Sequence, residues 1–137
     1  MSTDDIKSIM RRYTETVFNQ RDLSRLEEFL APNFVDHDGA PEPGPGPVRQ
    51  GLTVFLGAFP DLRIEILDMV AEDDKLACRY VISGTHLGDL FGLAPTGRRA
   101  VWQEQDITRF AGGQLVERWA TEDRLGQQQQ LGLLPSG

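Results

Sequence analysis

Residues 76–86 alternate between apolar and polar side chains, and this stretch restricts the possible folds more than any other. Its even positions are apolar: Leu76, Cys78, Tyr80 and Ile82. A period of two is typical of a strand with one face on a core and the other in water. A polar turn at 72–75 separates this stretch from a second strand candidate at 62–70. The chain is therefore expected to build an antiparallel sheet with one buried face.

Two further strands are expected at 98–110 and 115–121, joined by a tight turn at Gly112-Gly113. Within 62–70 the apolar residues change face, which indicates a bulge or a strand buried on both sides. The strand from Val101 carries polar residues on both faces. Alternation therefore does not choose between Gln105 and Asp106 for the buried face.

Helical spacing dominates the first half of the chain. Apolar residues recur at helical intervals over 3–19, over a short stretch after Asp22, and over 48–59, and a weaker helix is expected at 124–134. Helices gathered before a run of strands predict an α+β fold, here a single domain over residues 1–137. A bulged sheet curves, and helices that cap a curved sheet enclose a cavity.

Composition excludes several kinds of partner. The formal net charge of −7, without any basic run, argues against nucleic acid and against an anionic membrane surface. No apolar run is long enough to span a bilayer, and the acidic start lacks a signal-peptide core, so we expect a cytoplasmic protein. The single cysteine, Cys78, allows no intramolecular disulfide, and we expect it to be buried as a small apolar side chain.

Familiar cofactor and metal motifs are absent from the sequence. It has no glycine-rich phosphate loop, no HExxH and no CxxC. Two histidines cannot make a three-histidine site, and a site from His37, Asp38 and His86 has no specific spacing. We therefore expect no metal and no cofactor, and any catalysis is most simply acid–base chemistry by side chains.

The stretch 115–123 offers candidates for that chemistry. If the strand alternates from Leu115, then Glu117, Trp119, Thr121 and Asp123 share one face. A carboxylate beside an indole in a partly apolar pocket is a candidate general base, because desolvation raises its pKa. In the alternative interpretation, Trp119 belongs to the core and Asp123 caps the following helix.

Several segments, taken together, resemble SnoaL-like polyketide cyclases over residues 6–135. They are FNQRDLS at 18–24, LAPNFVDHD at 30–38, FPDL at 59–62, SGTH at 83–86, PTGR at 95–98, the Gly113 turn, VERW at 116–119 with Asp123, and QLGLLP at 130–135. The resemblance implies the nuclear transport factor 2-like cone, a curved antiparallel sheet capped by N-terminal helices around a deep apolar pocket. It also implies a homodimer or homotetramer packed through the sheet.

The resemblance further implies an intramolecular aldol condensation of a polyketide-like, apolar substrate without metal or cofactor. An aspartate near the end of the last strand is the family's acid/base and matches Asp123. Relatives often carry a histidine in the strand before the glycine turn, but none lies between Ala100 and Phe110 here. Arg118 stands where a histidine often precedes the tryptophan. If Asp106 lies near Asp123, repulsion between the carboxylates would keep one of them protonated.

These considerations give a candidate site. The expected catalytic residues are Asp123, His86 and Asp106. The expected substrate contacts are Trp119, His37, Gln105, Trp102, Phe59 and Phe91.

Two other functions remain open from the sequence. The first is a related cofactor-independent hydroxylase, or an epoxide hydrolase with an Asp-Arg-Asp set such as Arg79 with Asp106 and Asp123. However, Arg79 falls on the strand face opposite the apolar residues. The second is a non-catalytic protein that binds an apolar small molecule.

Overall fold

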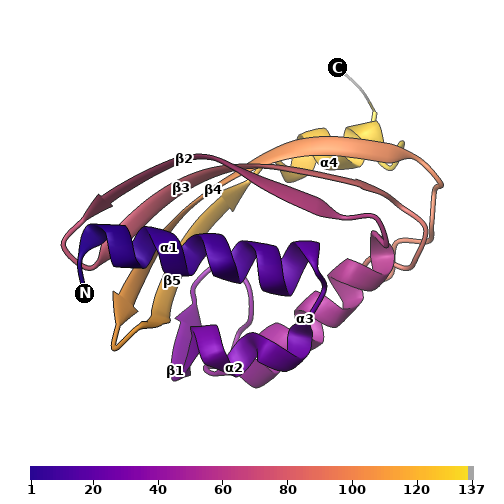
Figure 1. Cartoon of the computed structure of the whole chain (residues 1–137). Helices are drawn as coiled ribbons and strands as arrows, with labels where there is room; N and C mark the ends of the chain where they lie inside the picture. The colour runs from indigo at the N-terminus through magenta and orange to yellow at the C-terminus, as the bar shows by residue number, and fades with distance from the viewer. Residues whose placement is uncertain (136–137) are drawn as a thin grey trace.

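The computed structural model describes residues 1–135 and has the expected α+β architecture (Figure 1). A five-stranded sheet arches over the N-terminal helices. The helical elements are, in chain order, α1 (Thr3–Tyr13), the π-helical η1 (Thr14–Asn19), the 3₁₀-helical η2 (Leu23–Arg25), α2 (Leu26–Phe29), α3 (Pro45–Ala58) and α4 (Arg124–Gln130). No helix within residues 1–135 is long and apolar enough to cross a membrane.

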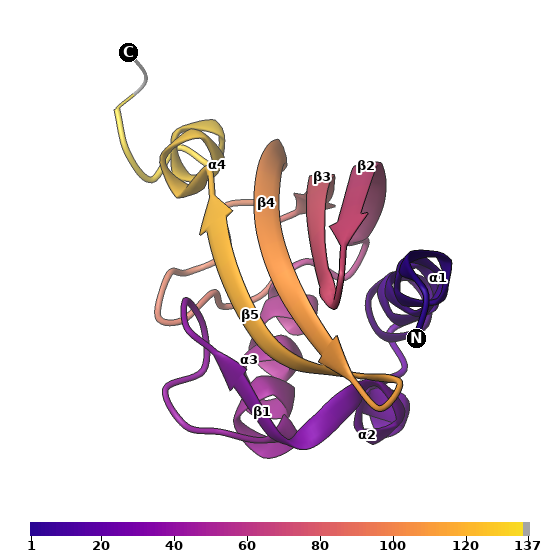
Figure 2. The same ribbon diagram turned by 90° about the vertical axis from the view of Figure 1, so that its left-hand side faces the viewer.

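The sheet has the strand order β1-β5-β4-β3-β2. Its strands are β1 (Leu30–Asp36), β2 (Arg63–Glu72), β3 (Lys75–Thr85), β4 (Arg99–Ala111) and β5 (Gln114–Glu122). The last four form the expected antiparallel meander. The sheet is mixed, however, because β1 pairs with β5 in parallel (Figure 2). The expected antiparallel sheet therefore comprises β2 to β5, and the parallel strand β1 is the difference from that expectation. Since β1 and β5 lie far apart in the chain, no turn sequence between them predicts that they pair.

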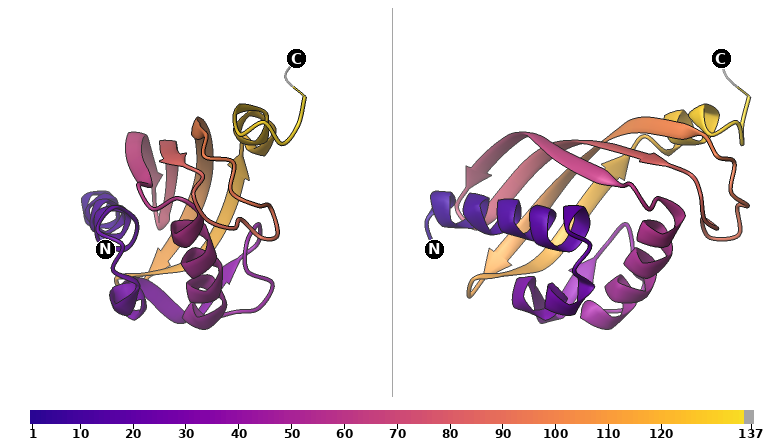
Figure 3. Two further views of the ribbon diagram at one scale, coloured as in Figure 1. Left: turned by 90° about the vertical axis from the view of Figure 1, so that its right-hand side faces the viewer. Right: turned by 45° about the vertical axis from the view of Figure 1, so that its right-hand side comes forward.

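Helices α1, α2 and α3 lie on one side of the arched sheet, which we call the inner face (Figure 3). The alternating side chains predicted for β3 point to this face, and Leu76, Cys78, Tyr80 and Ile82 are all buried. Apolar residues of α1 and α3 complete the core. Burial of this face drives the sheet and the helices together.

The expected bulge in β2 is present, between Ile66 and Asp68 opposite β3. A second irregularity lies at the start of β5. There Phe110 pairs with Leu115, while Arg109 pairs with Glu117, so Val116 is an extra residue in β5. Such a bulge reverses the faces of all later residues in its strand relative to those before it.

The helix expected near the C-terminus is shorter than predicted and ends at Gln130. The side chain of Gln130 binds the backbone of Val101 on β4, accepting from its N–H at 2.7 Å and donating to its carbonyl at 2.7 Å. These bonds place α4 beyond the end of β5 rather than over the inner face (Figure 2).

The helix predicted over 3–19 changes from α to π geometry at Thr14. Asn19, the last residue of the π turn, reaches β2, which is an edge strand. Its amide donates to the carbonyl of Ile64 at 3.0 Å and accepts from the N–H of Ile64 at 2.8 Å. One side chain therefore satisfies two backbone groups of an edge strand.

We expect Asn19→Ala to lower the free energy of unfolding by about 2 kcal/mol, because a partly buried N–H and carbonyl lose their partner. Urea denaturation measures this loss. The exposed Asn33→Ala is the matched control and should change stability by less than about 0.5 kcal/mol. Equal stability of the two variants would contradict a role for Asn19 in holding β2.

A candidate active site around Arg118

The inner face of β4 and β5 carries ionisable side chains where a core would be apolar. Asp106 on β4 is buried between Trp102 and Phe110, which share its face. On the neighbouring strand, the bulge in β5 turns Arg118 inward, where it pairs with Thr108, the next inward residue of β4 after Asp106. Buried charges occur in folded proteins when they are paired, and here the pairing is extensive.

Arg118 forms ion pairs with three carboxylates from two other strands. Its Nε donates to Asp106 Oδ2 at 3.0 Å, its Nη1 donates to Asp36 Oδ2 at 3.1 Å, and its Nη2 binds Glu104. We call Arg118, Asp36, Glu104 and Asp106 the Arg118 cluster. The side chain of Asp106 is 4% exposed and that of Arg118 is 22% exposed, so the cluster is largely sheltered from solvent.

Two tyrosines border the Arg118 cluster. The hydroxyl of Tyr80 on β3 lies 3.1 Å from both carboxylate oxygens of Asp106 and donates to that group. Tyr13, at the end of α1, packs its ring against Phe18 and Phe29, with centroid distances of 5.6 and 5.5 Å. The interior here is therefore part aromatic and part charged, which differs from a uniformly apolar pocket.

Burial sets the ionisation of the carboxyl groups. Desolvation raises the pKa of Glu104 to about 7, against the attraction of Arg118 and with added repulsion from Glu122 and Asp106. Glu122 lies directly opposite Glu104 on the ladder, and burial raises the pKa of its carboxyl too. Burial likewise raises the pKa of Asp106, although Arg118 opposes that shift. A carboxyl group that titrates near neutral pH can both accept and release a proton, as acid–base catalysis requires.

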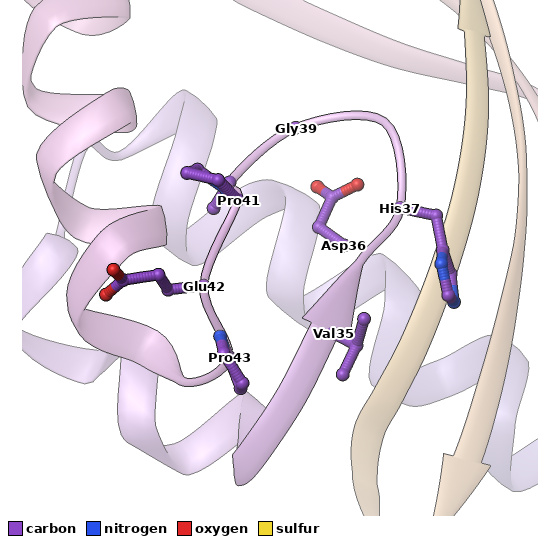
Figure 4. Close-up of a pocket in the computed structure, with 8 residues that line it drawn as sticks. Val35, Asp36, His37, Gly39, Pro41, Glu42 and Pro43 are labelled. Atoms are coloured by element: carbon purple, nitrogen blue, oxygen red, sulfur yellow. The ribbon is translucent and has the colours of Figure 1, made fainter.

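A cavity of about 310 Å³ has one member of this cluster, Asp36, in its lining (Figure 4). It lies under the segment 37–43, which we call the flap, and is lined by Val35, Asp36, His37, Gly39, Ala40, Pro41, Glu42 and Pro43. Asp36 lies beneath the flap and also binds Arg118. A Cβ at Gly39 would lie 2.6 Å from Asp36 Oδ2, so a larger residue there would displace the Asp36 carboxylate. The cavity and the Arg118 cluster therefore share Asp36.

A second hollow, of about 380 Å³, lies between α1, η1 and β2. It is lined by Lys7, Arg11, Thr14, Glu15, Asn19 and residues 63–69. It contains no member of the Arg118 cluster.

Trp119 lies on the outer face of β5, and Asp123 lies beyond the end of that strand. The bulge at Val116 separates them from Leu115, which is buried. Asp123 is exposed and caps α4, where its Oδ1 accepts from the N–H of Gly126 at 2.9 Å. Trp119 is 37% exposed and stacks on His37, with a centroid distance of 5.0 Å. The structure does not bring Asp123 to the Arg118 cluster.

Asp106 faces inward and Gln105 is exposed on the outer face, which resolves the choice that alternation left open. Asp106 pairs with Ala120 on the ladder and Asp123 lies beyond the end of β5. The two carboxylates therefore do not repel each other as expected. The carboxylates near Asp106 are those of Asp36 and Glu104.

His86, Phe59 and Trp102 come together in the core. The ring centroids of Phe59 lie 5.7 Å from His86 and 5.4 Å from Trp102. His86 is fully buried, and its Nδ1 accepts from the N–H of Thr96 at 3.3 Å. The structure separates this aromatic group from the flap cavity, whose lining contains none of the three. Phe91 is 67% exposed in the loop after β3.

Two alternative residue sets do not assemble. Arg79 binds Asp68 on the outer face at 2.8 Å, away from Asp106. His37 and His86 lie in different parts of the fold, one on the outer face and one in the core. Among residues 1–135, no three histidine, cysteine or carboxylate side chains are placed to hold a metal ion.

Sequence reasoning missed Glu104, Asp36 and Tyr80 as site residues. The period of two in β4 carries the relevant signal, because Trp102 and Phe110 have the same parity as Glu104 and Asp106. Two aromatic residues at the ends of one face indicate that the polar residues between them are buried as well. No sequence pattern predicts that Asp36 belongs to the site, because it meets Arg118 only through the parallel pairing of β1 with β5.

Comparison with known proteins identifies related sequences and structures. The family model described as SnoaL-like polyketide cyclase matches residues 8–131. Aklanonic acid methyl ester cyclase DauD of Streptomyces sp. (strain C5) is 28% identical over 109 residues, which cover 78% of this chain and 66% of DauD. The corresponding cyclase AcmA of Streptomyces galilaeus is 29% identical over 72 residues, or 53% of this chain and 50% of AcmA. The chain thus spans less than two thirds of either relative.

Solved structures are similar over nearly the whole chain. TsrD from Streptomyces laurentii has a TM-score of 0.90 at 27% identity and covers 98% of this chain and 99% of its own. IdmH from Streptomyces antibioticus, a proposed polyketide cyclase, has a TM-score of 0.79 at 29% identity and covers 92% of this chain and 97% of its own.

The raised pKa of Glu104 predicts a dependence of stability on pH. The folded state holds this proton more tightly than the unfolded chain does, so stability falls as pH rises from about 4.5 to about 7 and then levels off. We expect Glu104→Gln to reduce the slope in this window by up to about 1.4 kcal/mol per pH unit. Asp106 and Glu122 remain in the variant and contribute in the same direction.

Urea denaturation at a series of pH values measures this slope. Glu65→Gln, at an exposed site on β2, is the matched control and should follow the wild-type curve. Parallel curves for wild type and Glu104→Gln would show that Glu104 ionises alike in the folded and unfolded states.

Proposed function

The chain belongs to the SnoaL-like polyketide cyclase family, and on that premise we propose that it is a cofactor-independent cyclase acting at the Arg118 cluster. The proposed reaction is an intramolecular aldol condensation of an apolar, polyketide-like small molecule. The observation that carries the proposal is a carboxyl group with a pKa near 7, Glu104, held beside a guanidinium on the inner face of the sheet.

Glu104 is the proposed general base. A carbon between two carbonyl groups gives up a proton readily, and a carboxylate with a pKa near 7 is a stronger base than an ordinary one. The resulting carbanion attacks a ketone carbonyl within the same molecule, so a carbon–carbon bond forms and the carbonyl oxygen becomes an alkoxide. Protonated Glu104, or a neighbouring acid of the cluster, returns the proton to that alkoxide. The reaction therefore consumes no net proton.

Arg118 is the proposed donor that stabilises the developing negative charge. A guanidinium carries five N–H donors, and the carboxylates of the cluster engage its Nε, Nη1 and Nη2. Each terminal nitrogen has a second N–H that can point to an enolate or alkoxide oxygen. Tyr80 fixes the Asp106 carboxylate, which in turn fixes the guanidinium plane. Such preorganisation reduces the rearrangement that the reaction requires.

The flap cavity is the proposed route to this cluster. It contains Asp36, which binds Arg118 directly, and its lining mixes prolines and Val35 with carboxylates. A reactive chain entering there would place its polar carbonyl groups toward Arg118. Holding both reacting carbons in one conformation supplies much of the rate enhancement in an intramolecular condensation.

The proposal predicts a contrast between Glu104→Gln and Asp123→Asn. Loss of the base should reduce kcat by at least about a hundredfold. Asp123→Asn should retain kcat within about threefold, since asparagine also caps helices well. Turnover of aklanonic acid methyl ester, the compound in the names of the relatives, is the measurement. The reverse contrast would restore Asp123 as the base, as the sequence predicts.

A hydration reaction is a second candidate, because Arg118 lies between two aspartates, Asp36 and Asp106. An Asp-Arg-Asp set of this kind can hold a water molecule for attack on an epoxide. Turnover of an apolar epoxide by the wild type, without turnover of a polyketide ester, would favour this function over the cyclase. Binding of apolar compounds without turnover of either would favour a non-catalytic binding protein.

We also propose that two copies associate through the outer face of the sheet, as a homodimer. Val70, Ala77, Ile107 and Trp119 are direct ladder neighbours and form one row across β2, β3, β4 and β5. Val70 is 69% exposed, and Ile107 45%. A continuous apolar row on an exposed face is typical of a protein–protein contact. A cytoplasmic location stays a prediction from the sequence.

The homodimer predicts that Ile107→Glu produces monomers, because two carboxylates would be buried near the centre of the contact. Analytical ultracentrifugation measures the change in mass. Gln50→Glu, at an exposed site on α3, adds the same charge elsewhere and should leave the dimer intact. A wild type that sediments as a monomer at high concentration would rule out this interface.

A further inference from the structure

His37 lies at the root of the flap and points away from the cavity, toward β5 (Figure 4). Its ring stacks on Trp119 with an interplanar angle of 9°. Its Nε2 lies 2.8 Å from Glu117 Oε2. Since Trp119 and Glu117 both belong to β5, this one side chain fastens the start of the flap to the outer face of the sheet.

Backbone contacts continue this attachment along the flap. The N–H of His37 donates to the carbonyl of Arg118 at 2.9 Å, and Asp38 Oδ2 accepts from the N–H of Ala120 at 2.7 Å. The flap thus extends the pairing of β1 with β5 past Asp36. At its far end, the N–H of Gly44 donates to the carbonyl of Phe34 at 2.7 Å. The residues between these two attachments cover the cavity that contains Asp36.

Charged groups from β4, β5 and the β2–β3 hairpin surround His37. Glu117 faces it directly, and hydrogen bonds from His37 and Arg109 hold the pKa of Glu117 below its ordinary value, so that this carboxylate stays ionised. Arg109 on β4 occupies the other oxygen of Glu117 at 3.0 Å. Lys75 lies 6.0 Å from the centre of the Trp119 ring. Both cations oppose protonation, but neither is in direct contact with the imidazole in the way that Glu117 is.

A protonated imidazole would gain twice at this position. It would turn the hydrogen bond to Glu117 into an ion pair, and it would place a cation against the face of Trp119. Asp36 and Asp38, its neighbours in the flap, are already engaged by Arg118 and by Ala120. Protonation of His37 would therefore strengthen its contacts with Glu117 and Trp119 on β5.

We propose that His37 is a pH-sensitive latch that holds the flap closed over the Asp36 cavity when its imidazole is protonated and loosens it when neutral. Histidine is the side chain that changes charge between about pH 5 and pH 8. This regulation concerns access to the cavity and would operate whatever reaction the Arg118 cluster performs.

Hydrogen exchange at the amide of Ala120, which donates to Asp38 of the flap, tests the latch without any substrate. In the wild type, protection of this amide, corrected for the intrinsic exchange rate, should be about threefold higher near pH 5.5 than near pH 8. This is the factor that an exposed ion pair and a cation–π contact supply together. His37→Gln should lose this dependence on pH.

Two controls keep the result specific. His86, the other histidine of the sequence, stays in both proteins, so an effect that it causes would persist in His37→Gln. Glu117→Gln keeps the stack on Trp119 but removes the carboxylate, and it should lower the ratio of protection toward one. Equal protection at both pH values in the wild type, or the same ratio in His37→Gln, would overturn the latch.

Discussion

The structure depends on one sheltered cation. Arg118 on β5 binds Asp36 on β1 and both Glu104 and Asp106 on β4, so a single guanidinium links three strands. This link matters most for β1, whose pairing with β5 is irregular between Leu30 and Val35. Removing the cation would leave three carboxylates uncompensated, at a cost of about 3–5 kcal/mol for a buried pair. The carboxylates are therefore better probes of chemistry than Arg118, because their neutral amides can keep its hydrogen bonds.

Much of the fold could be predicted from local patterns. Alternation over 76–86 predicts β3 and its buried face, and the polar turn at 72–75 predicts the first hairpin. The change of face in 62–70 predicts the bulge in β2. The three N-terminal helices followed from helical spacing, although the π turn from Thr14 did not. The parallel pairing of β1 with β5 was missed, because it joins residues about eighty positions apart and no local pattern encodes it.

The candidate site is harder to predict, because one extra residue in β5 changes which side chains face inward. Val116 is extra in β5, so Leu115 and Arg118 both face inward while Trp119 faces out. Simple alternation from Leu115 assigns Trp119 and Asp123 to the pocket and Arg118 to the surface, which is the opposite of the observed arrangement. A bulge of this kind leaves no clear mark in composition. Asp106 is a candidate from the sequence, but its partners depend on the strand register, which sequence alone does not supply.

The amide of Asn19 has a consequence for the behaviour of the protein in concentrated solution. An open sheet ends in strands whose N–H and carbonyl groups can recruit strands from other molecules, and natural proteins block such edges to avoid aggregation. At the start of β2, the Asn19 side chain occupies both backbone groups of Ile64 and so takes the place of a neighbouring strand. A side chain at the end of a π turn thus blocks edge-to-edge addition at this point of β2, which lies 45 residues further along the chain.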